Sequence, residues 1–110
     1  MWDPIEGCVR ENLYRDWTYN PHAIYDPMLR GDMISVGHNL KTAWFLLRLS
    51  ELVKDERYLV YAKKLIDYCV KYGWDDQNFG FYEYCYRNGV LASKVKYWWP
   101  ECEGMLALLL

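Results

Sequence analysis

Residues 37–52 read GHNLKTAWFLLRLSEL and give the first indication of the fold. The apolar residues of this stretch recur at the three- and four-residue spacing of an α-helix. One face carries Leu40, Ala43, Trp44 and Leu47, and three further apolar residues widen that face: Phe45, Leu49 and Leu52. A helix that is apolar on two sides packs between neighbouring elements and does not lie on a surface. The stretch therefore predicts an enclosed helix.

A second helix is expected from about Glu56 to Tyr72. Lys54 and Glu56 interrupt the first apolar run, and Asp55 between them is a favoured N-cap residue. Gly73 follows the last periodic residue, and glycine readily takes the left-handed conformation that ends many helices. This second helix is also apolar on two faces. Two helices cannot enclose each other on both sides, so the pattern predicts a larger helical assembly.

The hydrophobic period shortens after the second helix. Residues 79–86 and 90–97 flank Asn88-Gly89, a dipeptide that favours the type I′ turn of a β-hairpin. Pro100 suits the first turn of a third helix, which the apolar run 105–110 continues to the last residue without a cap. An exposed run of this kind would promote aggregation, so we expect the chain to be a fragment. The predicted fold class is all-α, with a short β-hairpin between helices.

The first part of the chain lacks a clear hydrophobic period. Three prolines and two glycines interrupt residues 1–36, and the alternation within residues 9–17 is poor. We therefore expect loops or a short hairpin there. The predicted organisation is an irregular leading segment, 1–36, followed by a helical part, 37–110, that is truncated at its C-terminus.

Composition excludes several functional classes. A chain of 110 residues with a net charge of −2 and 53% hydrophobic residues forms at most one domain and is too apolar for disorder. The small negative charge gives no attraction for nucleic acid. The longest apolar run, 105–110, is far shorter than the roughly 20 residues of a membrane span. The first residues also lack the pattern of a signal peptide. We expect a soluble cytoplasmic protein without nucleic-acid or membrane partners.

Two residue classes bear on the ligand. Six tryptophans and eleven tyrosines combine apolar rings with polar N–H or O–H groups, which suits interfaces and clefts for polar ligands. Sugars fit such clefts, because their C–H faces stack on rings while their hydroxyls take hydrogen bonds; a tyrosine-rich core is the alternative. The four cysteines lie at least 16 residues apart and lack the spacing of a zinc site. We expect buried, reduced thiols, and no metal or cofactor.

The two histidines differ in context. His22 lies in a predicted loop with no reactive neighbour, and a structural role is favoured. His38 stands at the start of the first predicted helix, with Lys41 and Trp44 on the same face. A histidine near a helix start can have its neutral form favoured and act as a base. The alternative is a structural histidine.

A second cluster of candidate site residues lies within residues 96–103. Trp99 and Glu103 are one helical turn apart, so a ring and a carboxylate can face one ligand. In the alternative, Trp98 and Trp99 fill the start of the helix, and Glu101 with Glu103 interacts favourably with its dipole.

Four short motifs follow one another along the chain: Gly37-His38-Asn39-Leu40-x-x-Ala43-Trp44, Gly73-Trp74-Asp75, Gly80-Phe81-Tyr82 and Lys96-x-Trp98-Trp99-Pro100-x-x-Glu103. Their order and spacing resemble the N-acylglucosamine 2-epimerase family, which also contains cellobiose 2-epimerases, mannose isomerases and the renin-binding protein. The resemblance covers about residues 31–110. It implies part of an (α/α)6 barrel, a toroid of inner and outer helices like that of the six-hairpin glycosidases, with hairpins at the sugar-binding end.

The resemblance also implies roles for single residues. His38 corresponds to a general acid/base, and Trp44, Trp99 and Glu103 correspond to substrate-binding residues. The implied function is a sugar epimerase or isomerase of carbohydrate metabolism. It opens the ring of an aldose, removes the proton at C2 and returns it to C2 or C1. Such chemistry needs a base and a group that stabilises the enediolate.

The chain departs from the family pattern in two ways. Lys41 stands three residues after the histidine, where the family usually has glutamate. A lysine cannot orient the histidine as a carboxylate does, but it can stabilise an enediolate or contact an acidic sugar, so Lys41 is a candidate substrate-binding residue. The family's other catalytic histidine comes from a later helix. We therefore expect the fragment alone to be inactive, and the full-length protein is a candidate homo-oligomer.

Two other functions stay open at this point. A carbohydrate-binding protein that has lost its chemistry is consistent with Lys41. A glycoside hydrolase or lyase is also conceivable, because α/α toroids carry those activities too. Its candidate acids are Glu101 and Glu103, which diverge by about 200° on a helix and suit a facing carboxylate pair poorly.

Overall fold

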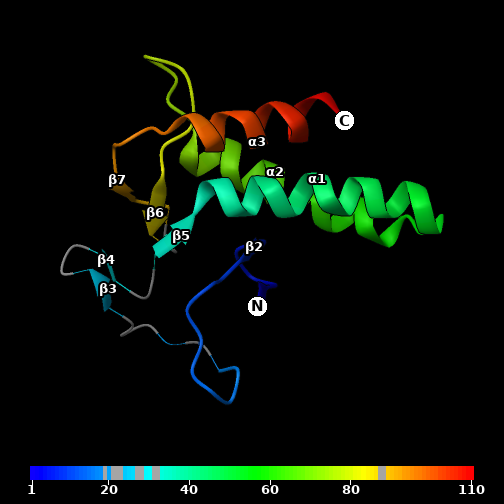
Figure 1. The fold of residues 1–110 in the computed structure, drawn as a ribbon, viewed down its shortest axis with the longest axis horizontal. Helices are drawn as coiled ribbons and strands as arrows, with labels where there is room; N and C mark the ends of the chain where they lie inside the picture. Colours follow the sequence, from blue (N-terminus) through cyan, green and yellow to red (C-terminus); the bar gives the residue numbers. More distant parts are fainter. Residues whose placement is uncertain (19, 21–23, 27–28, 31–32, 87–88) are drawn as a thin grey trace.

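A computed structural model describes residues 1–18, 20, 24–26, 29–30, 33–86 and 89–110 (Figure 1). Its helices in these ranges are α1 (Val36–Val53), α2 (Arg57–Gly73) and α3 (Trp98–Leu109). The sequence predicted each of them, and Pro100 lies in the first turn of α3 as expected. None of these helices is long and apolar enough to cross a lipid bilayer, within the described part of the chain.

The central helix is α1, which packs against both α2 and α3. Figure 1 shows that α1 and α3 begin at the same end of the molecule, close to β5, β6 and β7, and run in the same direction. α2 runs back after a turn in which Lys54 takes the left-handed conformation (φ 56°). The two parallel helices therefore bring their first turns together.

The prediction of an all-α fold with a short β-hairpin is confirmed only in part, because further small antiparallel sheets accompany the helices. β1 (Trp2–Asp3) pairs with β2 (Cys8–Val9), and β3 (Ile24–Asp26) pairs with β4 (Leu29–Arg30). A three-stranded sheet has the order β5 (Met33–Ser35), β6 (Tyr84–Tyr86), β7 (Leu91–Ser93). These strands are two or three residues long, too short to show an alternating pattern in the sequence.

The hairpin predicted after the second helix is confirmed as β6–β7, although its strands are shorter than expected. Gly89 has a positive φ of 80°, and Asn88 of the expected turn lies outside the described residues. β5 adds to this hairpin with Ile34 opposite Cys85. The sheet thereby links the start of α1 to the segment that leads into α3.

The expectation of a left-handed glycine cap at Gly73 is wrong. Gly73 is the last residue of α2, and the residue after it, Trp74, has extended geometry, so no left-handed glycine ends this helix. A Cβ placed on Gly73 would lie 2.7 Å from both methyl carbons of Val36. Glycine is needed here because α2 approaches the first residue of α1 closely.

The core lies between α1, α2 and the three-stranded sheet. Its fully buried side chains include Leu40 and Ala43 of α1, Leu65 and Cys69 of α2, and Cys85 of β6. The expected second apolar face of α1 is exposed in this chain: Phe45 is 51% exposed and Leu52 is 81% exposed. Apolar residues of α3 are exposed as well: Met105, Leu106, Leu108 and Leu109.

The loop between α2 and β6 is fixed to the start of α3 by Asp75. The side chain of this aspartate is 7% exposed and accepts a hydrogen bond from Lys96 Nζ at 2.7 Å. It also accepts the backbone N–H groups of Gln77 at 3.0 Å and Asn78 at 3.2 Å. Lys96 donates a further hydrogen bond to the carbonyl of Phe79.

These contacts predict that stability falls in acid. The hydrogen bond from Lys96 holds the pKa of Asp75 well below its ordinary value of 3.8, and the Asn78 and Gln77 amides add to this while burial opposes it. A carboxyl group with a lowered folded-state pKa stabilises the fold above its unfolded-state pKa, and this contribution is lost as pH falls toward the folded-state pKa. Urea midpoints are expected to drop from pH 6 to pH 3, and Asp75→Asn should flatten that drop.

The matched control is Asp67→Asn. Asp67 forms an exposed ion pair with Lys63, so its loss should change stability little at any pH. An acid dependence that is the same in Asp75→Asn and in the unaltered protein would contradict this account of the loop.

Candidate functional site

The first turn of α1 is held in place by two side chains. Ser35 caps the helix, because its Oγ accepts the backbone N–H of His38 at 3.3 Å. Asn39 is fully buried; its Oδ1 accepts the Val9 N–H at 2.7 Å, and its Nδ2 donates to the carbonyls of Val9 at 3.1 Å and Ser35 at 2.8 Å. These bonds fix the turn against β2, so His38 lies at a defined position with its side chain 56% exposed.

The structure brings together the five candidate site residues that the sequence indicated. Trp44 Nε1 donates a hydrogen bond to Glu103 Oε2 at 2.5 Å, and Lys41 Nζ lies 3.8 Å from Glu103 Oε1. The rings of His38 and Trp99 lie 5.2 Å apart between centroids, with 41° between their planes. Three of these residues belong to α1 and two to α3. They meet because the two helices run in parallel from the same end.

The cluster combines functions that suit a polyhydroxylated ligand. Glu103 is 15% exposed, and its two oxygens face the Trp44 indole and the Lys41 ammonium group, so its charge is largely balanced. Lys41 is 46% exposed and available to an anionic oxygen. His38 offers a base, and Trp99 offers a ring on which an apolar sugar face can stack.

Gly37 explains how Trp99 reaches its place beside His38. A Cβ on Gly37 would lie 2.4 Å from Trp99 Cζ3 and 2.5 Å from its Cη2, which is closer than van der Waals contact. The indole therefore packs directly on the backbone of the first helical turn. The glycine before the histidine is required for this packing.

The packing predicts that Gly37→Ala destabilises the protein. Alanine inside a helix is ordinarily about 1 kcal/mol more favourable than glycine. Here the overlap with Trp99 should reverse the sign, at a net cost of about 1 to 3 kcal/mol, and move the indole away from His38. Chemical denaturation measures the cost. In a Trp99→Leu background the same substitution should cost much less; an equal cost in both backgrounds would show that Trp99 is not the cause.

Glu101 and Trp98 do not join the cluster. Glu101 Oε1 accepts the backbone N–H of Phe81 at 2.8 Å and lies against Gly80, so it fastens α3 to the preceding loop. Trp98 is 78% exposed. Glu101 and Glu103 have different partners, so these two residues do not form the facing carboxylate pair considered for a glycoside hydrolase. His22 lies outside the described residues.

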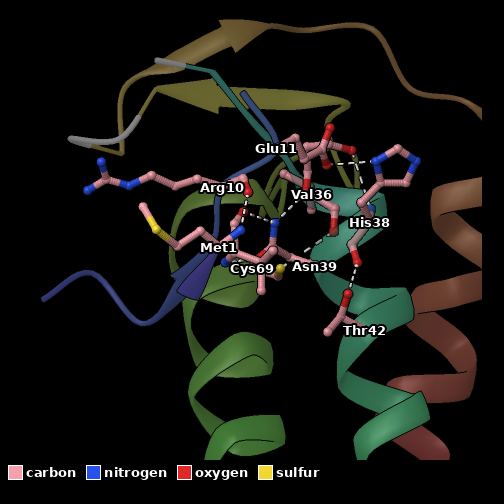
Figure 2. A network of polar contacts seen from close by, with 10 residues as sticks. Met1, Arg10, Glu11, Val36, His38, Asn39, Thr42 and Cys69 are labelled. Carbon is pink, nitrogen blue, oxygen red and sulfur yellow. Dashed lines mark hydrogen bonds and ion pairs between the residues drawn. The ribbon is translucent and has the colours of Figure 1, made fainter. Parts of the chain in front are cut away.

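A residue of the site that sequence reasoning missed is Glu11. Its Oε1 lies 2.6 Å from His38 Nδ1, and Figure 2 shows the two side chains facing each other. The two residues are 27 positions apart, and Glu11 belongs to the segment expected to be irregular. A short motif around Glu11 could not have indicated the contact, because β2 and Asn39 create it in three dimensions.

The cysteines are free, as expected, and three of them are buried: Cys8, Cys69 and Cys85. Burial raises the pKa of Cys8 to about 12, which makes its thiol a poor nucleophile near neutral pH. Cys102 is exposed, so the expectation of burial is wrong for this residue. Within the described ranges, no three His, Cys, Asp or Glu side chains are arranged to hold a metal ion.

Comparison with known proteins identifies the family of this chain. A sequence profile of the family described as N-acylglucosamine 2-epimerase (GlcNAc 2-epimerase) matches residues 2–110. The chain belongs to the N-acylglucosamine 2-epimerase family. The resemblance inferred from the four motifs is thereby confirmed, and the match extends over the leading segment as well.

Two relatives and one solved structure illustrate the membership. The D-mannose isomerase of Marinomonas mediterranea is 31% identical over 94 residues, which make up 84% of this chain and 23% of that protein. The N-acylglucosamine 2-epimerase of Bos taurus is 29% identical over 79 residues, or 67% of this chain and 19% of that protein. A crystal structure of D-mannose isomerase superimposes with a TM-score of 0.73 at 25% identity, over 86% of this chain and 25% of that chain. This family member therefore spans about a quarter or less of the proteins that it matches.

Proposed function

We propose that the protein carrying this segment is a sugar epimerase or isomerase that transfers a proton at C2 of an open-chain aldose. The observation that carries the proposal is the convergence of His38, Lys41 and Trp44 of α1 with Trp99 and Glu103 of α3. Family membership and relatives named D-mannose isomerase and N-acylglucosamine 2-epimerase support the same reaction class. The proposed partner is a small sugar.

In the proposed reaction, His38 removes the proton from C2 of the open-chain sugar. The C2–H electron pair forms the C1–C2 double bond of an enediolate, and the negative charge develops on the former carbonyl oxygen. The Lys41 ammonium group lies on the same helix face and can stabilise that charge. Delivery of a proton to the other face of C2 by a second acid, for which the family's later histidine is the candidate, gives the epimer. Return of the proton to C1, with a proton shift between the two oxygens, gives the ketose.

We also propose that residues 37–110 are part of an (α/α)6 barrel, with residues 1–36 as its leading segment. α1 and α3 would be inner helices and α2 an outer one. The parallel course of α1 and α3 supports this arrangement, as do the exposed apolar side chains of Phe45 and Leu52, which further helices would cover. Sequencing the coding DNA past codon 110 tests it: an open frame that encodes further amphipathic helices and a histidine is expected, and a stop codon directly after Leu110 would contradict it.

The reaction is tested with the protein expressed from its complete coding sequence. It is incubated with D-mannose, D-glucose and N-acetylglucosamine in turn, and the sugars are followed by proton NMR. Conversion of an aldose into its 2-epimer or its ketose is the expected result. Sugar binding in calorimetry without conversion would favour a carbohydrate-binding protein, and release of reducing ends from a polysaccharide would favour a hydrolase or lyase.

A further inference from the structure

The contact between Glu11 and His38 is built by the fold and does not arise from two mobile surface groups. The Asn39 side chain holds both the N–H and the carbonyl of Val9, two residues before Glu11. Arg10 and Met1 exchange backbone hydrogen bonds at 2.8 Å and 2.6 Å, and Asn20 N–H donates to the Asn12 carbonyl at 2.9 Å. Hydrogen bonds thus hold the backbone on both sides of Glu11.

The same residues fix the backbone of His38. The backbone N–H of His38 donates to Ser35 Oγ, and the side chain of the next residue, Asn39, donates to the Ser35 carbonyl. Because Asn39 also binds Val9, the start of α1 and the segment that carries Glu11 are held together. Glu11 is about one-third exposed, at 34%. Its carboxylate meets Nδ1 of the imidazole, and Nε2 lies at the other edge of the ring (Figure 2).

We propose that Glu11 is a positioning residue that keeps the proton of neutral His38 on Nδ1 and leaves the lone pair of Nε2 as the base. A carboxylate can only accept hydrogen bonds, so a 2.6 Å contact with Nδ1 requires N–H at that atom. The hydrogen bond made by one ring nitrogen determines which tautomer a histidine adopts. This inference rests on the proposed function for its catalytic consequence, but the tautomer itself can be measured without any activity.

Glu11 also acts during the proposed proton transfer. When the C2–H bond breaks, the proton forms an N–H bond at Nε2 and the electron pair stays with the enediolate. The imidazole becomes a cation, and the carboxylate on Nδ1 stabilises it, as the buried aspartate does for the histidine of a serine-protease triad. Lys41 does not compete for this carboxylate, because its ammonium group faces Glu103.

The test uses the complete protein labelled with ¹⁵N in its histidine rings. Signals of His38 are assigned by their loss in His38→Asn. In the unaltered protein at a pH where the ring is neutral, Nδ1 should have the shift of a protonated nitrogen and Nε2 that of an unprotonated one. Glu11→Leu should move the proton to Nε2. Glu11→Gln should retain the Nδ1–H form, because the amide oxygen still accepts, and should lose only the charge.

Kinetics supply the second measurement. Glu11→Leu and Glu11→Gln should lower kcat at least about 10-fold, the lower end of the loss seen when a hydrogen-bond partner of a metal-binding histidine is removed, with little change in KM. Glu51→Gln is the control: this carboxylate lies on α1 in an exposed pair with Arg48 and should change neither the tautomer nor kcat.

The outcomes separate this inference from the proposed function. An unchanged His38 tautomer in Glu11→Leu, or an unchanged kcat in both Glu11 variants, would overturn the role of Glu11. A tautomer that switches in Glu11→Leu, in a protein that converts no sugar, would overturn the proposed function and support the positioning role. If the Glu11→Leu protein fails to fold, Glu11→Gln decides the question. A retained tautomer with a reduced kcat in Glu11→Gln would support the role of Glu11. An unchanged kcat in that variant would contradict it.

Discussion

Replacing Leu40 with alanine is expected to lower the free energy of unfolding by about 2 to 5 kcal/mol, the range observed for leucine in well-packed cores. Leu40 is fully buried on α1, and its Cδ1 would lie 3.5 Å from a Cβ placed on Gly104 of α3. Phe81 packs on the same glycine, with ring carbons 2.5 and 2.8 Å from that position. The shorter side chain leaves a cavity at the junction of α1, α3 and the loop before β6, where close backbone packing limits collapse.

Urea denaturation followed by tryptophan fluorescence measures this effect. Leu52→Ala is the matched control, because it makes the same change on the same helix at a position that is 81% exposed. A change within about 0.5 kcal/mol is expected for the control. Similar costs at positions 40 and 52 would mean that α1 does not pack against α3 as described.

Replacing His38 with asparagine in the complete protein is expected to lower the rate of sugar conversion by about 10²- to 10⁴-fold, the usual contribution of a positioned general base. The side chain is 56% exposed, so the fold should tolerate the substitution with little change in stability. Initial rates and urea midpoints measured on the same preparations separate loss of chemistry from loss of structure.

Arg48→Ala serves as the control for the histidine variant. Arg48 is also an exposed residue of α1, and its side chain forms a surface pair with Glu51. Its removal should leave the rate within about twofold, since exposed pairs contribute little. A rate in His38→Asn equal to that of the unaltered protein would exclude His38 as the base.

The helices could be predicted from the sequence because their information is local. The 3.6-residue period of residues 37–52, the break at Lys54 and Asp55, and Pro100 near the start of the last helix depend only on near neighbours. The α1–α3 cluster followed from spacing plus family resemblance: Trp44 and Glu103 are 59 residues apart, and periodicity alone does not indicate that they meet.

Features that depend on distant segments could not be predicted. β5 is three residues long and exists because β6, about fifty residues later, pairs with it. Gly73 looked like a helix cap by local rules, but the close approach of Val36 is what requires glycine there. Glu11 carries no local pattern, and its contact with His38 depends on the Asn39 side chain binding Val9.

Hydrogen exchange at C2 of the sugar tests proton transfer by His38 directly. The complete protein is incubated with D-mannose, or with whichever aldose it converts, in D₂O, and the recovered aldose and its product are examined by NMR and mass spectrometry. We expect solvent deuterium to appear at C2 of the recovered aldose, and we expect His38→Asn to abolish this exchange. Deuterium exchange at C2 that is undiminished in His38→Asn would contradict proton transfer by His38.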